Sequence, residues 1–421
     1  MTSSPLKAGS ESRAHEVCNV CNMASLEDKG VGRRAHATIA EPKSLSEDER
    51  LERAAARSSR VIAFAGGLPS VALFPRGAIS KAFLRALSAD QGAALQYSWP
   101  EGMPELREYI AATLTKRGAK VSADRVIVTS GAQQALAIAM SVVRRKGLTI
   151  AFDPESYPGA LSAARDLGAH LVRMTDRAHL YYAMPEVAAP RGNCMPAGTR
   201  EELLTRARSA KAFIIEDDAY ADTAFHGALH PPLLADAPDR VFHVGTFSKT
   251  LCPGLRVGWL VTPEHLTKQA LQAKQNQDLQ SNGLTQSLLH AYLDLGRFEE
   301  LKARARRHYR RQAGLLMTAV SRHLPGFEFE PPQGGFSLWL ERKTAGGKEG
   351  VLFELAVRHG VSFDRGSTFR PHRGRRLAFR LCYSSVAAED IEPGVRRLAK
   401  AVERFDHQSA ARQAMTAPTA D

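Results

Sequence analysis

Lys249 is the residue of this chain best suited, by type and position, to chemistry on a carbonyl group. It follows the apolar, partly β-branched run VFHV (241–244), so its amine lies just past the end of a predicted strand. An amine shielded from water has a lowered pKa and can attack carbonyl carbon. Taken alone, such a lysine is more often a solvated loop residue than a catalytic one. The residues that accompany Lys249 therefore decide between the two interpretations.

Three further features follow predicted strands in the same way. Asp217 comes after the apolar part of KAFIIEDDAY (211–220), with Glu216 and Asp218 as competing acids, and Tyr157 follows a strand within 148–154. A helix is predicted to begin near Gly131, and free N–H groups at a helix start suit a phosphate. A cofactor with a phosphate, a flat ring, a basic ring nitrogen and an aldehyde would use all four features. Pyridoxal phosphate is such a cofactor.

The elements that must position these residues alternate between strand and helix from about 126 to 260. This pattern predicts a mostly parallel sheet with helices on its faces. After Gly326, short strands within 327–341, 360–363 and 375–385 and helices at 348–359 and 388–404 predict a smaller α+β lobe. We expect five segments: a mobile tail (1–45), a segment joining the small domain (46–95), a large cofactor-binding domain (96–320), a small C-terminal domain (321–405) and a second mobile tail (406–421).

Composition indicates a soluble globular enzyme. The 421 residues are 44% apolar and 24% charged, enough for two lobes. No apolar run reaches the ~18 residues of a membrane span, and the N-terminus lacks the apolar run of a secretory signal. Five cysteines do not suggest a disulfide scaffold. These features predict a cytoplasmic protein without a membrane partner.

Two local features suggest other ligands. The formal net charge of +13 and the run KARARRHYRR (302–311) raise nucleic-acid binding, but no nucleic-acid motif accompanies them. A solvated helix face explains the run, and we expect no nucleic-acid partner. Cys18 and Cys21 have C-x-x-C spacing, but no second ligand pair follows at the spacing of a zinc site. We therefore expect free thiols and no metal.

The motif around Lys249 resembles that of a known family. TFSKTLCPGLRVGW (246–259) contains the lysine, an arginine seven residues later and then Gly-Trp. Supporting matches are FAGGLPSVALFP (64–75), LQYSWPEG (95–102), TSGAQQAL (129–136), DPESYPGA (153–160), EDDAY (216–220) and FRLCYSS (379–385). The chain resembles the fold-type-I pyridoxal-phosphate enzymes of aminotransferase class I/II over about 60–404. Within them it is most similar to the 2-aminoadipate and kynurenine aminotransferases and the enzyme-like domain of the MocR regulators.

The resemblance implies a large domain with a mostly parallel, seven-stranded type of sheet and a role for each matching residue. Lys249 would form the Schiff base and shuttle a proton, Asp217 would pair with the ring nitrogen, Tyr220 would bond the phenolic oxygen and Tyr157 would stack on the ring. The phosphate would be bound by Gly131, Ala132, Gln133, Thr246, Ser248 and Arg256, and by Tyr97 of a neighbouring subunit in a homodimer. The substrate carboxylate would be bound by Arg380, with backbone approach at Gly66, Gly67, Gly334 and Gly335.

One turn departs from the family pattern. Members usually carry an Asn-Pro-Thr-Gly-like turn whose asparagine donates to the phenolic oxygen. Here YYAMPEVAAPRGNCMP (181–196) places Ala189 at that position and Arg191 where threonine is common, while Asn193 is out of register. The loss of this donor predicts a shifted pKa for the bond between lysine and cofactor. A pH titration of visible absorbance that is unchanged in Ala189→Asn would contradict this hypothesis.

The predicted function is aminotransfer between an L-amino acid and a 2-oxo acid by a ping-pong cycle, with a role in specialised biosynthesis. The first alternative is another pyridoxal-phosphate reaction on the same scaffold: oxidation, elimination or decarboxylation. The second alternative is a regulator that senses pyridoxal phosphate. Such regulators carry an N-terminal helix-turn-helix domain, and no such pattern is evident before the enzyme-like part.

Overall fold

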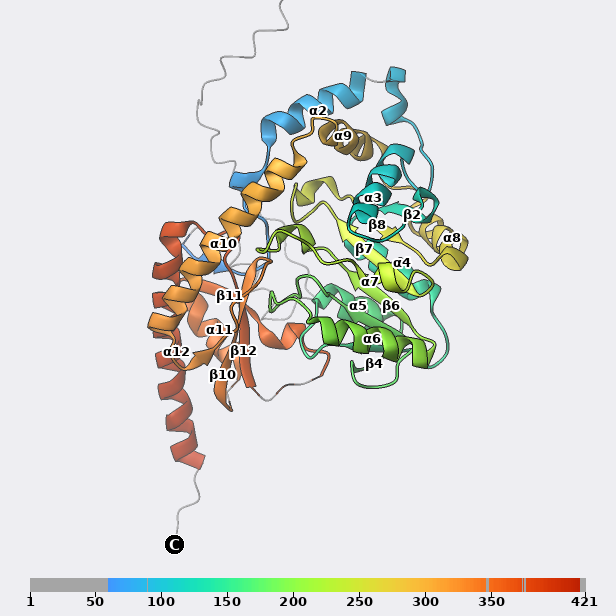
Figure 1. Ribbon diagram of the computed structural model, residues 1–421. Helices are drawn as coiled ribbons and strands as arrows, with labels where there is room; N and C mark the ends of the chain where they lie inside the picture. The colour runs from blue at the N-terminus through green and yellow to red at the C-terminus, as the bar shows by residue number, and fades with distance from the viewer. Residues whose placement is uncertain (1–59, 89, 346–347, 373, 375, 417–421) are drawn as a thin grey trace, which may run out of the picture. The chain divides into compact units, whose positions relative to one another are not determined.

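A computed structural model describes residues 60–88, 90–345, 348–372, 374 and 376–416. All of them belong to one compact unit, Leu51–Asp421, which contains two β-sheets with their helices (Figure 1). The predicted N-terminal tail, including Cys18 and Cys21, lies outside the described residues.

The larger sheet has seven strands in the order β2-β8-β7-β6-β5-β3-β4. Its strands are β2 Val126–Thr129, β3 Thr149–Phe152, β4 His170–Arg173, β5 Leu180–Ala183, β6 Phe213–Asp217, β7 Val241–Thr246 and β8 Gly258–Val261. Only β8 runs antiparallel, to β2 on one side and β7 on the other. The neighbouring pairs from β7 to β4 are parallel. The predicted α/β fold with a mostly parallel, seven-stranded sheet is confirmed.

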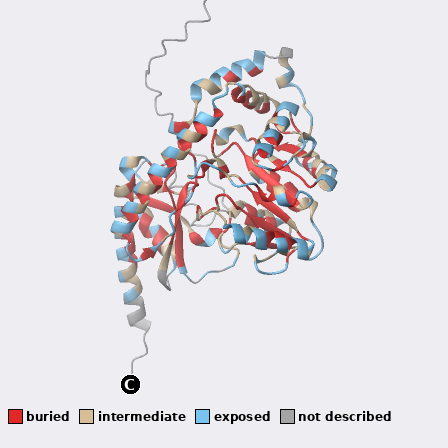
Figure 2. Ribbon diagram, viewed as in Figure 1, coloured by how far each residue is buried: buried red, intermediate tan, exposed pale blue. Residues whose placement is uncertain are grey.

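Alternating side chains of this sheet enter two separate cores. On β6, Ile214 belongs to one cluster of buried residues and Ile215 to the other, and Tyr181 and Tyr182 of β5 divide in the same way. This division follows from the two-residue period of a strand. Because helices cover both faces, the central strands are buried at nearly every position, as Figure 2 shows in red.

Two groups of helices supply these covers. Residues of α4 Ala132–Val142, α5 Pro158–Asp166 and α8 Thr267–Asp278 pack in the first cluster. The second cluster takes residues from α2 Arg76–Ser88, α3 Pro104–Lys116, α6 Ala197–Ala210, α7 Leu233–Asp236 and α9 Gly283–Leu293.

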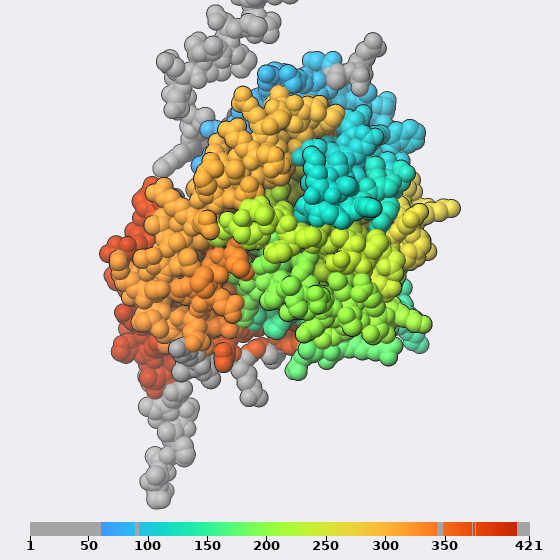
Figure 3. All heavy atoms as spheres, in the orientation of Figure 1, coloured from blue at the N-terminus to red at the C-terminus, as the bar shows by residue number. Residues whose placement is uncertain are grey.

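The smaller sheet has five strands in the order β1-β11-β12-β10-β9. They are β1 Ile62–Phe64, β9 Phe327–Glu328, β10 Ser337–Ala345, β11 Val361–Arg365 and β12 Arg376–Cys382. The N-terminal strand β1 pairs in parallel with β11, so residues far apart in sequence share this sheet. Helices α10 Phe298–His323, α11 Glu349–Arg358 and α12 Ala388–Thr416 belong to this half of the chain. Figure 3 shows its orange and red residues gathered beside the green residues of the larger sheet.

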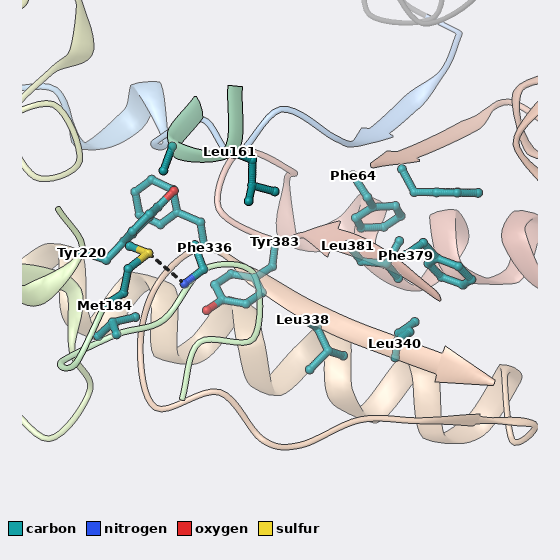
Figure 4. Packing of buried hydrophobic residues seen from close by; sticks show 14 of the residues in the cluster. Phe64, Leu161, Met184, Tyr220, Phe336, Leu338, Leu340, Phe379, Leu381 and Tyr383 are labelled. Carbon is teal, nitrogen blue, oxygen red and sulfur yellow. Dashed lines mark hydrogen bonds between the residues drawn. The ribbon is translucent and has the colours of Figure 1, made fainter. Parts of the chain in front are cut away.

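One buried cluster continues from the small sheet to the loops of the larger one. Figure 4 shows side chains of β10, β12 and β1 packed together, among them Leu338, Leu340, Phe379, Leu381 and Phe64. Phe336, just before β10, meets the ring of Tyr220 edge-on with 5.1 Å between centroids. The small sheet therefore packs directly against a residue that the sequence assigned to the cofactor.

The structure differs from the sequence-based expectation at the C-terminus. Helix α12 continues to Thr416 and so enters the segment 406–421, where a mobile tail was predicted. Its residues 388–405 bury Ile391, Val395, Leu398 and Phe405, and this apolar period continues the helix past the predicted boundary. Among the described helices, none is both long and apolar enough to cross a bilayer.

Candidate active site

Three strands of the larger sheet end in register at one edge. Thr129 of β2 and Thr246 of β7 both lie opposite Gly258, the first residue of β8. Asp217, the last residue of β6, lies opposite Val244 of β7. The carboxyl ends of the parallel strands thus bring these residues to the edge where α/β sheets place their ligands.

Lys249 lies just beyond β7 and is half-buried. Its Nζ donates to the carbonyl oxygen of Gly67 at 3.4 Å. The same Nζ lies 5.1 Å from the ring centroid of Tyr220 and 5.7 Å from that of Phe336. The amine is therefore held between a glycine carbonyl and two aromatic rings, in contrast to the solvated lysine that the sequence left open.

Asp217 is 3% exposed and accepts two hydrogen bonds. The Tyr182 hydroxyl donates to its Oδ2 at 2.7 Å, and the Ala219 N–H donates to its Oδ1 at 3.1 Å. Burial raises the pKa of the Asp217 carboxyl to about 6, although both hydrogen bonds oppose the shift. In the part of the chain that the structure describes, no cationic side chain forms an ion pair with it. A cationic group of a ligand would stabilise the ionised form.

The acids on either side of Asp217 have partners of their own. Glu216 accepts from the N–H groups of Leu233 and Leu234, at 2.7 and 3.1 Å, at the start of α7. Asp218 pairs with Arg117 and lies 3.3 Å from His243 Nε2. Burial would raise the pKa of Asp218, but the Arg117 guanidinium and the hydrogen bonds from His243 and Arg117 hold it below its usual value. The three acids therefore serve three different contacts.

Helix α4 begins at a cradle that only glycine can form. Gly131 is its N-cap, with φ of 93°, and a Cβ there would lie 2.7 Å from Arg256 Nη2. The same Nη2 donates to the carbonyl oxygen of Ser130 at 3.1 Å. A Cβ at Gly258 would lie 2.8 Å from the Ala132 nitrogen, so β8 also closes on this helix start. The free N–H groups and the guanidinium together suit an anion.

Three further predicted phosphate residues are Thr246, Ser248 and Gln133. The Thr246 hydroxyl donates to Ser248 Oγ at 3.0 Å, and both residues are buried. Gln133 Nε2 donates to the Gly159 carbonyl at 2.9 Å. A Cβ at Gly159 would meet both the Gln133 side chain and the Tyr157 ring, so these two side chains converge on one spot.

Arg380 is held by a carboxylate that the sequence did not identify. Its Nε and Nη2 lie 2.9 and 2.8 Å from Asp364 Oδ2, and its guanidinium lies 4.6 Å from the Phe369 ring centroid. Asp364 also accepts from the Gly66 N–H at 3.0 Å. Gly67 has φ of 57°, and a Cβ there would lie 3.2 Å from Arg380 Nη2. One glycine turn thus contacts both Arg380 and, through its carbonyl, Lys249.

Gly334 and Gly335 pack against the wall formed by Val187. A Cβ on Gly334 would lie 2.7 Å from Val187 Cγ2, and one on Gly335 would lie 3.3 Å from Val187 Cγ1 and 4.0 Å from Tyr220 Cδ1. The Tyr383 hydroxyl donates to the Gly335 carbonyl at 3.0 Å. Close packing therefore explains both glycines.

Ala189 and Tyr97 are the remaining predicted positions. Ala189 is buried, and its N–H donates to Met184 Sδ at 3.5 Å (Figure 4). With Met184 and Asn193 it lines a cavity of about 390 Å³. Tyr97 is 78% exposed, and its described hydrogen bond joins its N–H to the Gln96 side chain.

These side chains fit the cofactor that the sequence predicts. The half-buried amine of Lys249 matches an aldehyde, the buried carboxyl of Asp217 matches a ring cation, and the start of α4 with Arg256 matches a phosphate.

The sequence did not identify the residues that orient Asp217 and Arg380. Tyr182 reaches Asp217 across paired strands β5 and β6, and Asp364 reaches Arg380 across β11 and β12. An acid following the predicted strand at 360–363 was the available signal for Asp364.

Comparison with known proteins identifies the relatives of this chain. The family model described as "Aminotransferase class I and II" matches residues 71–398. The 2-aminoadipate transaminase of Thermus thermophilus is 32% identical over 396 residues, covering 89% of this chain and 96% of that protein. The crystal structure of Pyrococcus horikoshii kynurenine aminotransferase, in complex with PMP, matches with a TM-score of 0.80 at 28% identity, covering 86% of this chain and 95% of that one.

Regulators also occur among the relatives. An uncharacterized HTH-type transcriptional regulator of Bacillus subtilis, YdfD, is 27% identical over 357 residues, covering 80% of this chain and 73% of that protein.

Proposed function

This chain belongs to the class I and II aminotransferases, a family that uses pyridoxal 5′-phosphate, and we propose that Lys249 and Asp217 carry its reaction. An amino acid leaves its amine at the site as a 2-oxo acid departs, and a second 2-oxo acid takes the amine away. The observation that supports these roles is the placement of a half-buried amine just beyond β7 and a buried carboxyl, without an ion-pair partner among the described residues, at the end of the adjacent strand β6.

Bound pyridoxal phosphate supplies an electron sink for the electrons released when the substrate Cα loses its proton. Lys249 Nζ is the base that accepts this proton, and the Gly67 carbonyl holds the amine in place for it. The Asp217 carboxylate, oriented by the Tyr182 hydroxyl, keeps the ring nitrogen protonated. Tyr157 would stack on the face of the cofactor ring, and the Tyr220 hydroxyl would bond its phenolic oxygen.

The start of α4 would hold the phosphate of the cofactor. The N–H groups after Gly131 and the nearby Arg256 guanidinium would donate hydrogen bonds to it. Thr246 and Ser248, which bond each other where β7 ends, and Gln133 in the first turn of α4 would complete this set. The buried setting strengthens each of these interactions.

Arg380 binds the carboxylate of the amino acid. Asp364 contacts one edge of the Arg380 guanidinium. The N–H groups on the other edge can then donate to the substrate carboxylate. Gly66 and Gly67 keep the turn beside it free of side chains. A bound α-carboxylate at Arg380 presents the Cα to Lys249, since the same turn contacts both residues.

A homodimer with shared sites completes the proposal. Large apolar side chains lie exposed on η1 Val71–Leu73, η2 Asp90–Leu95 and the segment that follows: Val71, Leu95, Tyr97 and Trp99 are 65–78% exposed. Such a patch is typical of an interface. In the dimer, Tyr97 would reach the phosphate of the neighbouring subunit.

The proposed setting is the cytoplasm. Cys194, Cys252 and Cys382 are free thiols, as a reducing compartment keeps them. Within the family, a specialised biosynthetic role is consistent with the Ala189 departure, because that turn lines a cavity beside the site.

A half-reaction measurement tests the aminotransferase mechanism. Purified protein with its cofactor is mixed with single amino acids, and absorbance follows conversion between the two cofactor forms. We expect conversion by some amino acid, with its 2-oxo acid appearing, and reversal by a 2-oxo acid. Lys249→Ala should show neither. Conversion that releases ammonia or carbon dioxide and cannot be reversed by any oxo acid would instead support the elimination or decarboxylation alternatives.

A further inference from the structure

Four side chains that can bind a transition metal meet outside the active site. Glu186 and Cys194 come from the loop between β5 and α6, and His226 and His230 come from the loop before α7. One ligand atom from each residue lies within 4.8 Å of all the others. The sequence did not suggest this group, because its members fit no usual metal-binding spacing.

Three of the separations between these atoms are close to those of a tetrahedral zinc site. His226 Nε2 and His230 Nδ1 each lie 3.3 Å from Glu186 Oε1. Cys194 Sγ lies 3.7 Å from His230 Nδ1. A tetrahedron with bonds of about 2.0–2.1 Å to nitrogen and oxygen and about 2.3 Å to sulfur places neighbouring ligand atoms roughly 3.3–3.6 Å apart.

The orientation of the His226 ring provides independent support. Its Nδ1 lies 2.7 Å from the carbonyl oxygen of Ala228, which can only accept, so Nδ1 carries a hydrogen. In the neutral ring, Nε2 then directs a lone pair at the carboxylate of Glu186. Two electron-rich atoms at 3.3 Å require a cation between them, either a proton or a metal ion. A backbone carbonyl that fixes the far ring nitrogen is the arrangement found around metal-bound histidines.

The charge balance around Glu186 also favours a cation. Its side chain is 2% exposed, and its ion-pair partners among the described residues are the two histidines. The neighbouring guanidinium groups have other partners: Arg117 pairs with Asp218 and donates to the carbonyl oxygen of His230, and Arg200 donates to that of Pro231. A buried carboxylate without a strong cationic partner is costly.

We propose that Glu186, Cys194, His226 and His230 form a structural Zn²⁺ site. Thiolate and imidazole ligands favour zinc over magnesium or calcium, and four protein ligands leave no open position for catalysis. On binding, the Cys194 thiol gives its proton to solvent as the zinc–sulfur bond forms. Burial and the Glu186 charge raise the pKa of this thiol, and the metal offsets both effects. The proposal does not depend on the reaction assigned to Lys249.

The ion would join two loops that border the active site. Glu186 and Cys194 flank the turn that contains Ala189, and Val187 next to Glu186 packs on Gly334 and Gly335. Cys194 N–H and Phe225 N–H both bond Gln333, at its side chain and carbonyl respectively. Zinc would therefore stabilise the wall of the site without touching the substrate.

Metal analysis of the full-length holoenzyme tests the proposal. After incubation with Zn²⁺ and exhaustive dialysis, wild type should retain about one zinc per chain, and X-ray absorption should show one sulfur ligand at about 2.3 Å. Cys194→Ser and His226→Gln should weaken zinc binding by more than the roughly 10–100-fold that loss of an outer partner costs. Cys252→Ser is the matched control and should retain the ion. Zinc should raise the melting temperature of wild type and of the control only.

A background lacking Cys18 and Cys21 separates the two groups of cysteines. Cys18→Ser/Cys21→Ser should still bind zinc, with the sulfur ligand present. The proposal is overturned if wild type retains no zinc, or if the bound zinc is lost with Cys18 and Cys21 while Cys194→Ser has no effect. Either result would leave the cluster as histidine–carboxylate pairs. Because Cys194 and His226 are partly exposed, both variants should fold, which circular dichroism would verify.

Discussion

At the scale of single residues, three consecutive acids have three environments. Glu216 caps α7, Asp218 pairs with Arg117, and Asp217 contacts only hydrogen-bond donors among the described residues. The sequence assigned the contact with the cofactor ring to Asp217, with Glu216 and Asp218 as competing acids. The partners of Glu216 and Asp218 favour Asp217, and substitution of each acid should have a different effect.

Asp217→Asn should lower kcat by about 10²–10³-fold, the usual effect of removing a preorganised charge at a reacting group, with little loss of stability. Asp218→Asn should instead lower the free energy of unfolding by about 3–5 kcal/mol, because it leaves the Arg117 guanidinium buried without its partner. Kinetics and urea unfolding of both variants measure the difference. Equal losses of activity in the two variants would contradict the assignment.

The pKa of Asp217 predicts how the stability of the cofactor-free protein depends on pH. The folded carboxyl has a pKa of about 6 and the unfolded one has 3.8. Between these values the folded state binds more protons, so Asp217 makes stability fall as pH rises through this window. Relative to wild type, Asp217→Asn should therefore gain up to about 3 kcal/mol between pH ~4 and pH ~6. Urea unfolding across that range measures the gain, and a difference that does not change with pH would refute it.

The residues that hold the site could not be predicted from the sequence alone. Lys249, Asp217 and Arg256 stand at recognisable distances from predicted strands and from one another. Tyr182 and Asp364 act through the register of neighbouring strands, and a shift of one residue would turn either side chain to the opposite face. Such contacts depend on pairing between distant segments, which local patterns do not encode.

At the scale of elements, the start of α4 depends on glycine. Gly131→Ala places a Cβ 2.7 Å from Arg256 Nη2 at a backbone conformation with φ of 93°. We expect strain of about 1–3 kcal/mol and cofactor binding weakened by at least about tenfold. Gly198→Ala in the first turn of α6 is the control, since its Cβ would meet nothing within 4 Å. Cofactor titration of both variants measures the effect. Equal affinities would contradict the role of Gly131 in binding the cofactor phosphate.

Most elements around the site could be predicted from the sequence. Physical reasons explain why the others could not. The strands leading to Asp217 and Lys249 are short apolar runs, but both extend further than their sequences indicated, to Asp217 and Thr246. The edge strand β4 is largely exposed and lacks an apolar pattern. Strand β8 begins within the lysine motif, where Gly258 is required by its contact with α4.

At the scale of the whole molecule, the exposed apolar patch with Tyr97 predicts that two chains share their sites. Lys249→Ala chains lack the amine, and Tyr97→Ala chains should lack a phosphate contact supplied to the partner. When the two variants are mixed and allowed to exchange subunits, one site of each hybrid dimer has both residues. Activity should therefore exceed that of either variant alone. Unchanged activity in a mixture shown to contain hybrids would argue against sharing.

The most direct test of the central claim is to trap the cofactor on the protein. Holoenzyme is reduced with borohydride and digested, and mass spectrometry locates the phosphopyridoxyl group. The account predicts this group on Lys249, in the peptide that contains the residues after β7, and no trapping in Lys249→Ala. Attachment to another lysine, such as the buried Lys274 that pairs with Asp278, or equal trapping in the variant, would contradict it.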